Sequence, residues 1–470
     1  MPSDVNQTHI EKLESLPEGW AETSVSEIIQ IVSTNQKKVA QKKYLAEGKF
    51  PIIDQGKKFI AGYSDDESLL INDGLPFIVF GDHTRTFKYV NFNFVPGADG
   101  VKVMKPLGVN SKWCFYMFQA IKLPNKGYAR HFQYLKEAYL PIPPPEQQKR
   151  IVAKVDELFS HIDAGIEALK KAQKLLKQYR QSVLKAAVTG ELTKGWREAN
   201  KDELEPASEL LERILKERRQ KWEEQQLKQF QAKGKMPKDD KWKGKYKEPE
   251  SLNRENNPEL PEGWKVCVFD QLITELKNGI SKKPAEESGL AIFRISAVRP
   301  MEIKKYDVRF LPNDFDSSGY EIEDDDLLFT RYNGNPELVG VCGKVNGLQR
   351  ETVYPDKLMR ARLVNKQLIS PDYLELSLNC GISKEFIRSS TKTTAGQSGI
   401  AGGDVKKTPV ILPSYKEQMQ IAGIVDEKFT VIKHLEAELN LQLIKAGKNK
   451  QSILASAFQG KLIRGLVDDI

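Results

Sequence analysis

The chain has 470 residues, 40% of them hydrophobic and 29% charged, which is enough for about two to four globular domains. Its net charge of +8 permits an anionic partner such as nucleic acid but does not require one. No apolar run approaches the ~18 residues that span a bilayer, and the start MPSDVNQTHIEKLES lacks the zones of a secretory signal. We therefore expect no membrane association and a cytoplasmic location.

Residues 1–142 are predicted to form a first globular domain, which opens with the pentapeptide LPEGW at Leu16 to Trp20. Its body, residues 21–139, contains the β-branched and aromatic runs FPIIDQG, LPFIVFGD and FKYVNFNFV, broken by Gly, Asp and Asn. Such runs are typical of short strands joined by turns. We expect a mixed α/β fold.

Residues 143–192 are predicted to form a long helix. Apolar or small residues recur alternately four and three positions apart, at Ile151, Val155, Leu158, Ile162, Gly165, Leu169, Ala172, Leu176, Tyr179, Val183 and Ala186. This is a heptad seam, and a heptad seam needs a partner helix to cover it. At ~1.5 Å per residue, the stretch from Ile151 to Ala187 would be roughly 55 Å long.

Residues 193–258 are predicted to be a charged helical and Lys-rich linker. The stretch PASELLERILKERRQKWEEQQLKQF is amphipathic and charged, and Pro206 suits a first helical turn. The stretch from Lys233 to Lys247 is rich in lysine. A charge run of this kind is usually a solvated linker, and the alternative is an arm that contacts phosphates.

Residues 259–412 are predicted to form a second α/β domain, again opened by LPEGW at Leu260 to Trp264. Strand-like runs are LAIFRISAV, DLLFTRY, LVGVCGKV and RARLV, and SPDYLELSLN reads as a helix. The body, residues 265–409, does not resemble the body of the first domain in sequence.

Residues 413–470 are predicted to form a second long helix that repeats the first. Pro143 aligns with Pro413, and Gly190 with Gly460, at a constant shift of 270 positions. A period this long indicates a duplicated domain, because repeat arrays use units of roughly 20 to 50 residues. The second seam is less regular, since Lys428, Gln442 and Asn449 fall in its register. We expect the two helices to pair antiparallel within one chain; the alternative is a homodimer through like helices.

Recognisable catalytic signatures are missing from the sequence. It contains no phosphate-binding G-x-x-x-x-G-K-[ST] loop, no G-x-G-x-x-G after a strand and no Asn-Pro-Pro-[FY] tetrapeptide. The five histidines are dispersed, and none has metal-ligand spacing. The acidic run Glu323 to Asp326 reads as an exposed turn. Together these features favour a binding protein without a metal site of its own.

Polar side chains that suit DNA contact follow the predicted strands of both bodies. Arg and Lys pair with guanine edges and with phosphates, and Asn or Gln pair with adenine. In the first domain the candidates are Asp82, His83, Thr84, Arg85 and Lys88 in GDHTRTFKY, with Tyr128, Arg130 and His131 in GYARHF. In the second they are Arg294, Ser296, Arg331, Tyr332 and Asn333 after strands, with Lys392, Thr393, Gln397 and Ser398 in KTTAGQSGIAGG. The alternative is that half of them are ordinary polar residues of surface loops with no role in DNA binding.

The whole pattern resembles the DNA-specificity subunit of type I restriction-modification systems. The resemblance rests on LPEGW at the start of each half, on the EQ-x-x-I-x-x-x-V-D-E-x-F entry to the second helix with its QQ counterpart in the first, and on QSVLKAAVTGELTKGWRE. It implies two target-recognition domains that alternate with two long helices paired as an antiparallel coiled coil. It also implies that each domain reads one half of a bipartite, asymmetric site on double-stranded DNA.

The resemblance further implies that this chain has no catalytic residue and binds no cofactor itself. Two modification (methyltransferase) subunits would use S-adenosylmethionine, and two restriction subunits would use ATP and Mg²⁺. Three other hypotheses remain: an enzyme with an unrecognised site, a self-associating coiled-coil interaction protein, and an orphan DNA-binding protein. Cofactor binding by the isolated chain would favour the first, and dimerisation without partners the second; neighbouring genes would identify the third.

Overall fold

A computed structural model describes the chain over residues 16–98, 100–124, 130–234, 236–237, 239–251, 259–394 and 396–463. The chain forms two compact units. Residues 1–173 and 437–470 make the first unit, and residues 174–436 make the second. Among the described residues, none of the helices is both long and apolar enough to cross a membrane.

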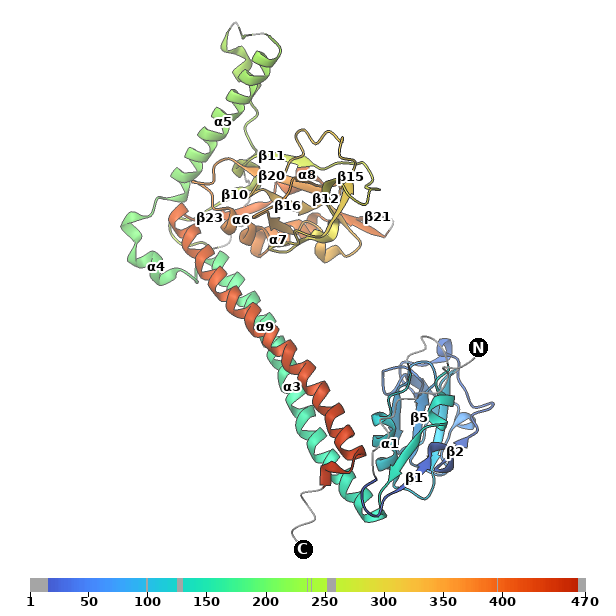
Figure 1. Ribbon diagram of the computed structural model, residues 1–470. Helices are drawn as coiled ribbons and strands as arrows, with labels where there is room; N and C mark the ends of the chain where they lie inside the picture. The colour runs from blue at the N-terminus through green and yellow to red at the C-terminus, as the bar shows by residue number, and fades with distance from the viewer. Residues whose placement is uncertain are drawn as a thin grey trace. The chain divides into compact units, whose positions relative to one another are not determined.

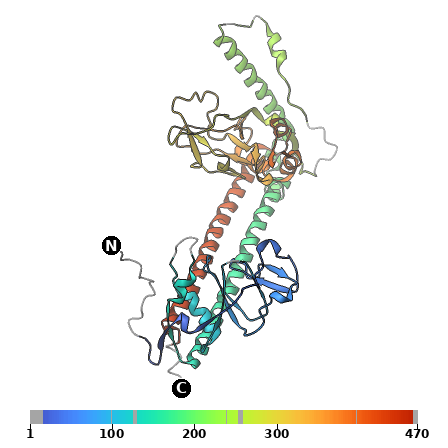
Figure 2. The same cartoon turned by 90° about the vertical axis from the view of Figure 1, so that its right-hand side faces the viewer.

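The two long helices are α3 (Pro145–Thr189) and α9 (Tyr415–Phe458), and each contributes to both units. In the first unit Lys450 Nζ donates to Asp163 at 2.5 Å, and Gln173 Nε2 donates to Asn440 at 2.8 Å. Residue numbers fall along α9 as they rise along α3, so the helices are antiparallel, and both views show them side by side (Figures 1 and 2). The predicted pairing within one chain is confirmed.

Burial along the predicted seam of α3 is uneven. Ile151, Val155 and Val183, which lie near the helix ends, are fully or almost fully buried. Positions between them are mostly half-buried, and Gly165 and Tyr179 are exposed. The reason is geometric, because a single partner helix covers only one side of the seam, whereas the globular domains add further cover at the ends.

The first domain consists of short strands with two helices. Its elements are β1 (Ala21–Ser24), β2 (Ile29–Val32), β3 (Phe50–Ile53), β4 (Gly62–Ser64), β5 (Phe77–Gly81), β6 (Phe87–Val90), β7 (Val95–Pro96), β8 (Val101–Pro106), α1 (Ser111–Ala120), α2 (Phe132–Lys136) and β9 (Tyr139–Ile142). A four-stranded sheet has the order β2-β8-β5-β6, a three-stranded sheet has the order β4-β3-β7, and β1 pairs with β9.

The second domain has more strands. Its strands are β10 (Lys265–Val268), β11 (Ile273–Asn278), β12 (Leu290–Phe293), β13 (Val298–Arg299), β14 (Glu302–Ile303), β15 (Val308–Leu311), β16 (Leu327–Thr330), β17 (Tyr332–Asn333), β18 (Cys342–Lys344), β19 (Thr352–Val353), β20 (Leu358–Leu363), β21 (Lys392–Thr394), β22 (Gln397–Gly399) and β23 (Pro409–Leu412). Its helices are α6 (Pro371–Leu378), α7 (Gly381–Ser390) and α8 (Gly402–Lys406).

The two domains share one topology although their sequences differ. In the second domain the four-stranded sheet has the order β11-β20-β16-β18, the three-stranded sheet β15-β12-β19, and β10 pairs with β23. Both three-stranded sheets contain one parallel pair, β3 with β7 and β12 with β19. The second domain adds the small sheet β17-β22-β21. The duplication seen in the helices therefore extends to the domains.

LPEGW forms the same turn in both halves. Trp20 N donates to Pro17 O and Trp264 N to Pro261 O, each at 3.1 Å. The glycines have φ of +77° at Gly19 and +83° at Gly263, values that glycine adopts without a steric penalty. The turn therefore explains why the pentapeptide contains glycine at its fourth position.

Each LPEGW turn packs against the end of the long helix from the other half. A Cβ added to Gly460, after α9, would lie 2.8 Å from Pro17, and one added to Gly190, after α3, would lie 2.4 Å from Pro261. The first pair lies within the first unit and the second pair within the second. The two halves thus close in a circular arrangement, each domain starting where the other half's helix stops.

The segment predicted to be a linker belongs in part to the second domain. It contains α4 (Lys194–Ala199) and α5 (Ala207–Ala232), and α5 buries Ala207, Leu210, Leu211 and Ile214 in the same hydrophobic core as strands of the second domain. Trp242, in the Lys-rich stretch, is 8% exposed and stacks on Trp222 of α5. The apolar positions of the amphipathic pattern thus face a protein core, so this stretch is more than a solvated spacer.

Candidate nucleic-acid interface

Asp82 and His131, two predicted DNA contacts, are buried and are hydrogen-bonded to each other. Asp82 is 3% exposed, and its Oδ1 accepts hydrogen bonds from the main-chain N of His131 and of Phe132, both at 2.7 Å. His131 is fully buried, and its Nδ1 lies 2.9 Å from Asp82 O. Asp82 therefore caps the start of α2, and neither side chain is placed to reach a base. The prediction that they contact DNA does not hold in this structure.

Lys88 and Ser398 are also buried, which contradicts their predicted role. Lys88 is 4% exposed, and burial lowers the pKa of its ammonium, an effect that Asp54 partly offsets. Ser398 is 2% exposed, and its Oγ lies 2.7 Å from Thr393 Oγ1 across the β21–β22 hairpin. Both residues hold loops together instead of facing solvent.

Three further candidates of the first domain, His83, Thr84 and Arg85, lie together in the β5–β6 turn. Thr84 is exposed and donates from Oγ1 to Gln55 O at 2.5 Å, while His83 is half-buried and its main-chain N donates to Gln55 Oε1. Arg85 has a φ of +59°, an uncommon value for a residue with a Cβ, and it lines a cavity of about 460 Å³ with Thr84 and Gln119. Arg130 is exposed, and Tyr128 lies outside the described residues.

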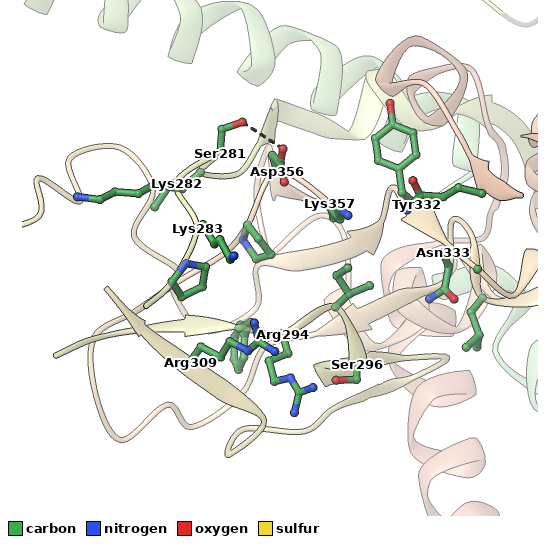
Figure 3. Close-up of a pocket in the computed structure, with 18 of the residues that line it drawn as sticks. Ser281, Lys282, Lys283, Arg294, Ser296, Arg309, Tyr332, Asn333, Asp356 and Lys357 are labelled. Carbon is green, nitrogen blue, oxygen red and sulfur yellow. Dashed lines mark hydrogen bonds between the residues drawn. The ribbon is translucent and has the colours of Figure 1, made fainter. Parts of the chain in front are cut away.

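A cavity of about 650 Å³ in the second domain brings five of the predicted residues together. They are Arg294, Ser296, Tyr332, Asn333 and Gln397, which come from three separate segments of the sequence. Figure 3 labels the first four of them. Lys392 and Thr393 are exposed on the neighbouring strand β21 and do not line the cavity.

The cavity is strongly basic. Its described lining includes Lys282, Lys283, Arg294, Arg299, Arg309 and Lys357, against one acidic side chain, Asp356. Asp356 accepts a hydrogen bond from Ser281 Oγ at 3.1 Å (Figure 3), and Arg294 Nη1 lies 3.5 Å from Asp307 with half of its side chain still exposed. Most of the positive charge therefore remains available to an anion.

Tight backbone packing positions Tyr332 beside the cavity. Strand β17 pairs with β22, and a Cβ added to Gly399 of β22 would lie 2.4 Å from the Tyr332 ring. Only glycine lets the strand pass so close to the ring. The guanidinium of Arg331 lies 4.8 Å from the ring centroid, a cation–π contact. Arg331 thus supports Tyr332 and does not itself line the cavity.

The basic cavity and the β5–β6 turn occupy equivalent places in the shared topology. Asp82 directly follows β5, and its carbonyl accepts from His131 N at 3.0 Å; Arg331 directly follows β16, and its carbonyl accepts from Ile400 N at 3.0 Å. Asp54 likewise follows β3 as Arg294 follows β12. In each domain the candidate residues therefore lie at the corresponding end of the four-stranded and the three-stranded sheet.

The sequence prediction missed five basic residues of the cavity. They are Lys282, Lys283, Arg299, Arg309 and Lys357. Each stands alone or in a pair in its own loop or strand, and only the pairing of distant strands brings them together. A search for basic residues at the ends of the predicted strands would have found Arg299, which directly follows LAIFRISAV, and Lys357, which lies three residues before RARLV.

Ligands for a metal ion are not grouped in the described parts of the chain. No three His, Cys, Asp or Glu side chains among these residues are arranged to hold one. The four cysteines, Cys114, Cys267, Cys342 and Cys380, are buried free thiols, and burial raises the pKa of each. They are packing residues, as their scattered positions indicated.

The chain thus contains two modules of one topology, each with its candidate residues at the same end, which alternate in the sequence with two long, paired helices. A chain from a solved structure of a type I restriction-modification system has this fold, matching 95% of this chain and 100% of its own length with a TM-score of 0.61 and 15% identity. At this identity the likeness speaks for the fold alone.

Sequence comparisons give the family. The profile described as the type I restriction modification DNA specificity domain matches residues 17–175. The EcoKI specificity subunit of Escherichia coli strain K12 is 34% identical over 326 residues, 69% of this chain and 57% of that protein. The StySPI specificity subunit of Salmonella potsdam is 27% identical over 330 residues, with the same coverage of 69% and 57%. The chain belongs to the family of type I restriction enzyme specificity subunits, and it spans little more than half the length of these two relatives.

Proposed function

We propose that this chain recognises double-stranded DNA for a type I restriction-modification complex, with one domain reading each half of a bipartite, asymmetric site. The observation that carries the proposal is the basic cavity of the second domain. There, residues from separated segments bring positive charge, an aromatic ring and two amide side chains together at one end of the sheets.

The side chains of the cavity suit two kinds of DNA contact. Phosphate contacts supply most of the affinity and come from Lys and Arg, here Lys283, Arg309 and Lys357. Base contacts supply specificity, and the amides of Asn333 and Gln397 can pair with adenine edges. We assign the reading of bases in this half-site to Asn333 and Gln397.

The two half-sites differ in sequence under this proposal. At equivalent places, the two positions that follow Asp82 and Arg331, the first domain offers His83 and Thr84, and the second offers Tyr332 and Asn333. Because the side chains differ while the topology is shared, the two domains present different donors and acceptors to the grooves. The paired helices α3 and α9 would set the length of the unread spacer.

The chain supplies no catalytic residue under this proposal. Two modification subunits transfer the methyl group of S-adenosylmethionine to N6 of adenine, and two restriction subunits use ATP and Mg²⁺ for translocation and cleavage. Support comes from membership of the specificity-subunit family and from the missing cofactor signatures in the sequence. A purified chain that methylated DNA with S-adenosylmethionine by itself would contradict this.

The test is a genome-wide map of methylated adenines in cells that carry the native chain, no chain, or the variants Asn333→Ala and Gln397→Ala. We expect the native map to give two different half-sites at a fixed spacing. Each variant should relax one or two bases in one half-site and leave the other half-site unchanged. Gln220→Ala, on the exposed side of α5, is the matched control. Loss of sequence preference in both half-sites together, or an unchanged map for both variants, would overturn the assignment.

A further inference from the structure

The β3–β4 loop of the first domain carries an exposed basic tip. Residues 54–61 connect the two strands, and within them Lys57, Lys58 and Phe59 are consecutive exposed residues. The Phe59 side chain is 45% exposed although its ring packs edge-on against Phe92 at 6.1 Å between centroids. None of these three residues was expected from the sequence to contact DNA.

The tip is held from beneath by the buried ammonium of Lys88. Its Nζ donates to Asp54 O at 2.8 Å, to Lys58 O at 2.6 Å and to Phe59 O at 3.3 Å, and lies 3.5 Å from the Asp54 carboxylate. Burial of a charge away from water is unfavourable unless hydrogen bonds compensate it. A single buried cation thus fixes three carbonyls of the loop, of which only residues 57–59 are exposed.

The side of the tip is fixed as well. Gln55 O accepts from Thr84 Oγ1 at 2.5 Å, and Asp54 Oδ1 accepts from Gly56 N at 2.8 Å. The first bond joins the loop to the β5–β6 turn, where Thr84 and Arg85 lie, and the second bond fixes the start of the loop itself. The tip therefore belongs to the same end of the sheets as the candidate residues already described.

The second domain provides an independent comparison at the equivalent place. The segment that follows β12 there contributes Arg294, Ser296 and Arg299 to the basic cavity. In the first domain the segment that follows the equivalent strand, β3, carries the exposed residues Lys57 and Lys58. Both domains thus place positive charge after this strand, although they do so with different residues.

We propose that Lys57 and Lys58 bind DNA phosphates in the first half-site, and that Lys88 is the positioning residue that presents them. This inference rests on the proposed function, because it names the phosphate contacts of the same recognition domain. The rigid anchoring matters for affinity, since a loop ordered during folding pays no ordering cost on binding. Contacts to phosphates carry no base information, so the tip sets register and affinity but not sequence preference.

The experiment measures binding of the full chain, assembled with its modification subunits, to a random-sequence duplex over a range of salt concentrations. Each phosphate contact contributes about 0.9 to the slope of log K against log salt. We expect Lys57→Gln with Lys58→Gln to reduce the slope by about 1.8 and to leave the methylated sequence unchanged. Lys49→Gln is the matched control, because Lys49 is exposed at the opposite end of β3. An unchanged slope in the double variant would overturn the proposal.

A double-mutant cycle tests the positioning role of Lys88. Lys88→Met should weaken binding, and it should add little further loss when Lys57 and Lys58 are already glutamine. A merely structural role would give the same loss in both backgrounds. If Lys88→Met does not fold, the exposed double variant still decides the proposal. Substitution of Arg309 and Lys357 in the second domain separates the outcomes: if these lower the slope and the tip variants do not, the inference fails and the proposed function stands.

Discussion

The indole Nε1 of Trp264 donates to Oε2 of Glu417 at 2.7 Å, and this bond joins the second LPEGW turn to the first turn of α9. The same carboxylate accepts from Thr193 Oγ1 at 2.7 Å and from Arg197 Nη1 at 2.8 Å, and Glu417 is 1% exposed. In the first half Trp20 Nε1 donates to Gln147 Oε1 at 2.7 Å. In each half, the tryptophan of the LPEGW turn thus forms a hydrogen bond to the first turn of the long helix of that half.

Glu417→Ala should destabilise the second unit more than Gln147→Ala destabilises the first. The first change leaves Arg197 without its buried partner and costs about 3 to 5 kcal/mol, whereas the second removes a neutral acceptor and costs about 1 to 3 kcal/mol. Hydrogen exchange at the amides of Trp264 and Trp20 measures local opening of each turn. Equal acceleration at both turns would show that the Arg197 and Thr193 contacts add nothing.

Alanine at Gly190 or Gly460 should weaken the packing of that helix end against the LPEGW turn of the other half. Both residues have positive φ, +79° and +71°, and an added Cβ would meet a proline ring at 2.4 Å and 2.8 Å. Each substitution is expected to cost about 1 to 3 kcal/mol through backbone strain. Thermal unfolding measures the effect.

The helix interiors provide matched controls for these glycines. Gly165 and Gly447 lie within α3 and α9 with open space around an added Cβ. Alanine there should stabilise by about 0.5 to 1 kcal/mol, because glycine is a poor helix residue. Destabilisation at all four positions would point to a general intolerance of the helices and against the specific contacts with Pro17 and Pro261.

Glu375 should make the second domain less stable as pH rises from about 4.5 to about 7. Burial raises the pKa of this carboxyl to about 7 from an ordinary value of 4.5, although it accepts a hydrogen bond from Lys344 N at 2.5 Å. The folded state therefore holds the proton more tightly than the unfolded state does. Stability from this group is present below pH about 4.5 and is lost as pH rises through about 7.

Glu375→Gln removes that pH dependence. Each pH unit between the two pKa values corresponds to about 1.4 kcal/mol, so at pH 8 the variant should be more stable by up to about 3 kcal/mol. The advantage should shrink towards pH 5. Urea unfolding at the two pH values gives the comparison, with the exposed Glu385→Gln as control. An identical pH profile for Glu375→Gln and the native chain would refute the assignment to this carboxyl.

Local periodicity and repetition made the helices predictable, because both signals lie within short stretches. The Ile151 seam and the Pro143–Pro413 alignment were enough to predict α3, α9 and their pairing in one chain. The shared topology of the domains was not predictable, since it resides in pairings such as β3 with β7 that join residues far apart in unlike sequences.

The candidate site was predictable only in part. Tyr332 and Asn333 follow a strand and face a cavity, but Asp82 follows a strand and caps a helix. A polar residue after an apolar strand looks the same in both cases, and the difference depends on what packs above it. Lys88 shows the limit most clearly, because an alternating strand pattern does not reveal that its ammonium meets three carbonyls.

The pairs β1 with β9 and β10 with β23 place the entrance and exit of each module next to each other. Ala21 pairs with Ile142, and Lys265 pairs with Leu412. The residues between each pair of strands form a module, and the positions of its two ends do not depend on the sequence of the module. Under the proposed function, an exchange of coding sequence between these two borders would change the DNA half-site that the module recognises and would leave helices α3 and α9 unchanged.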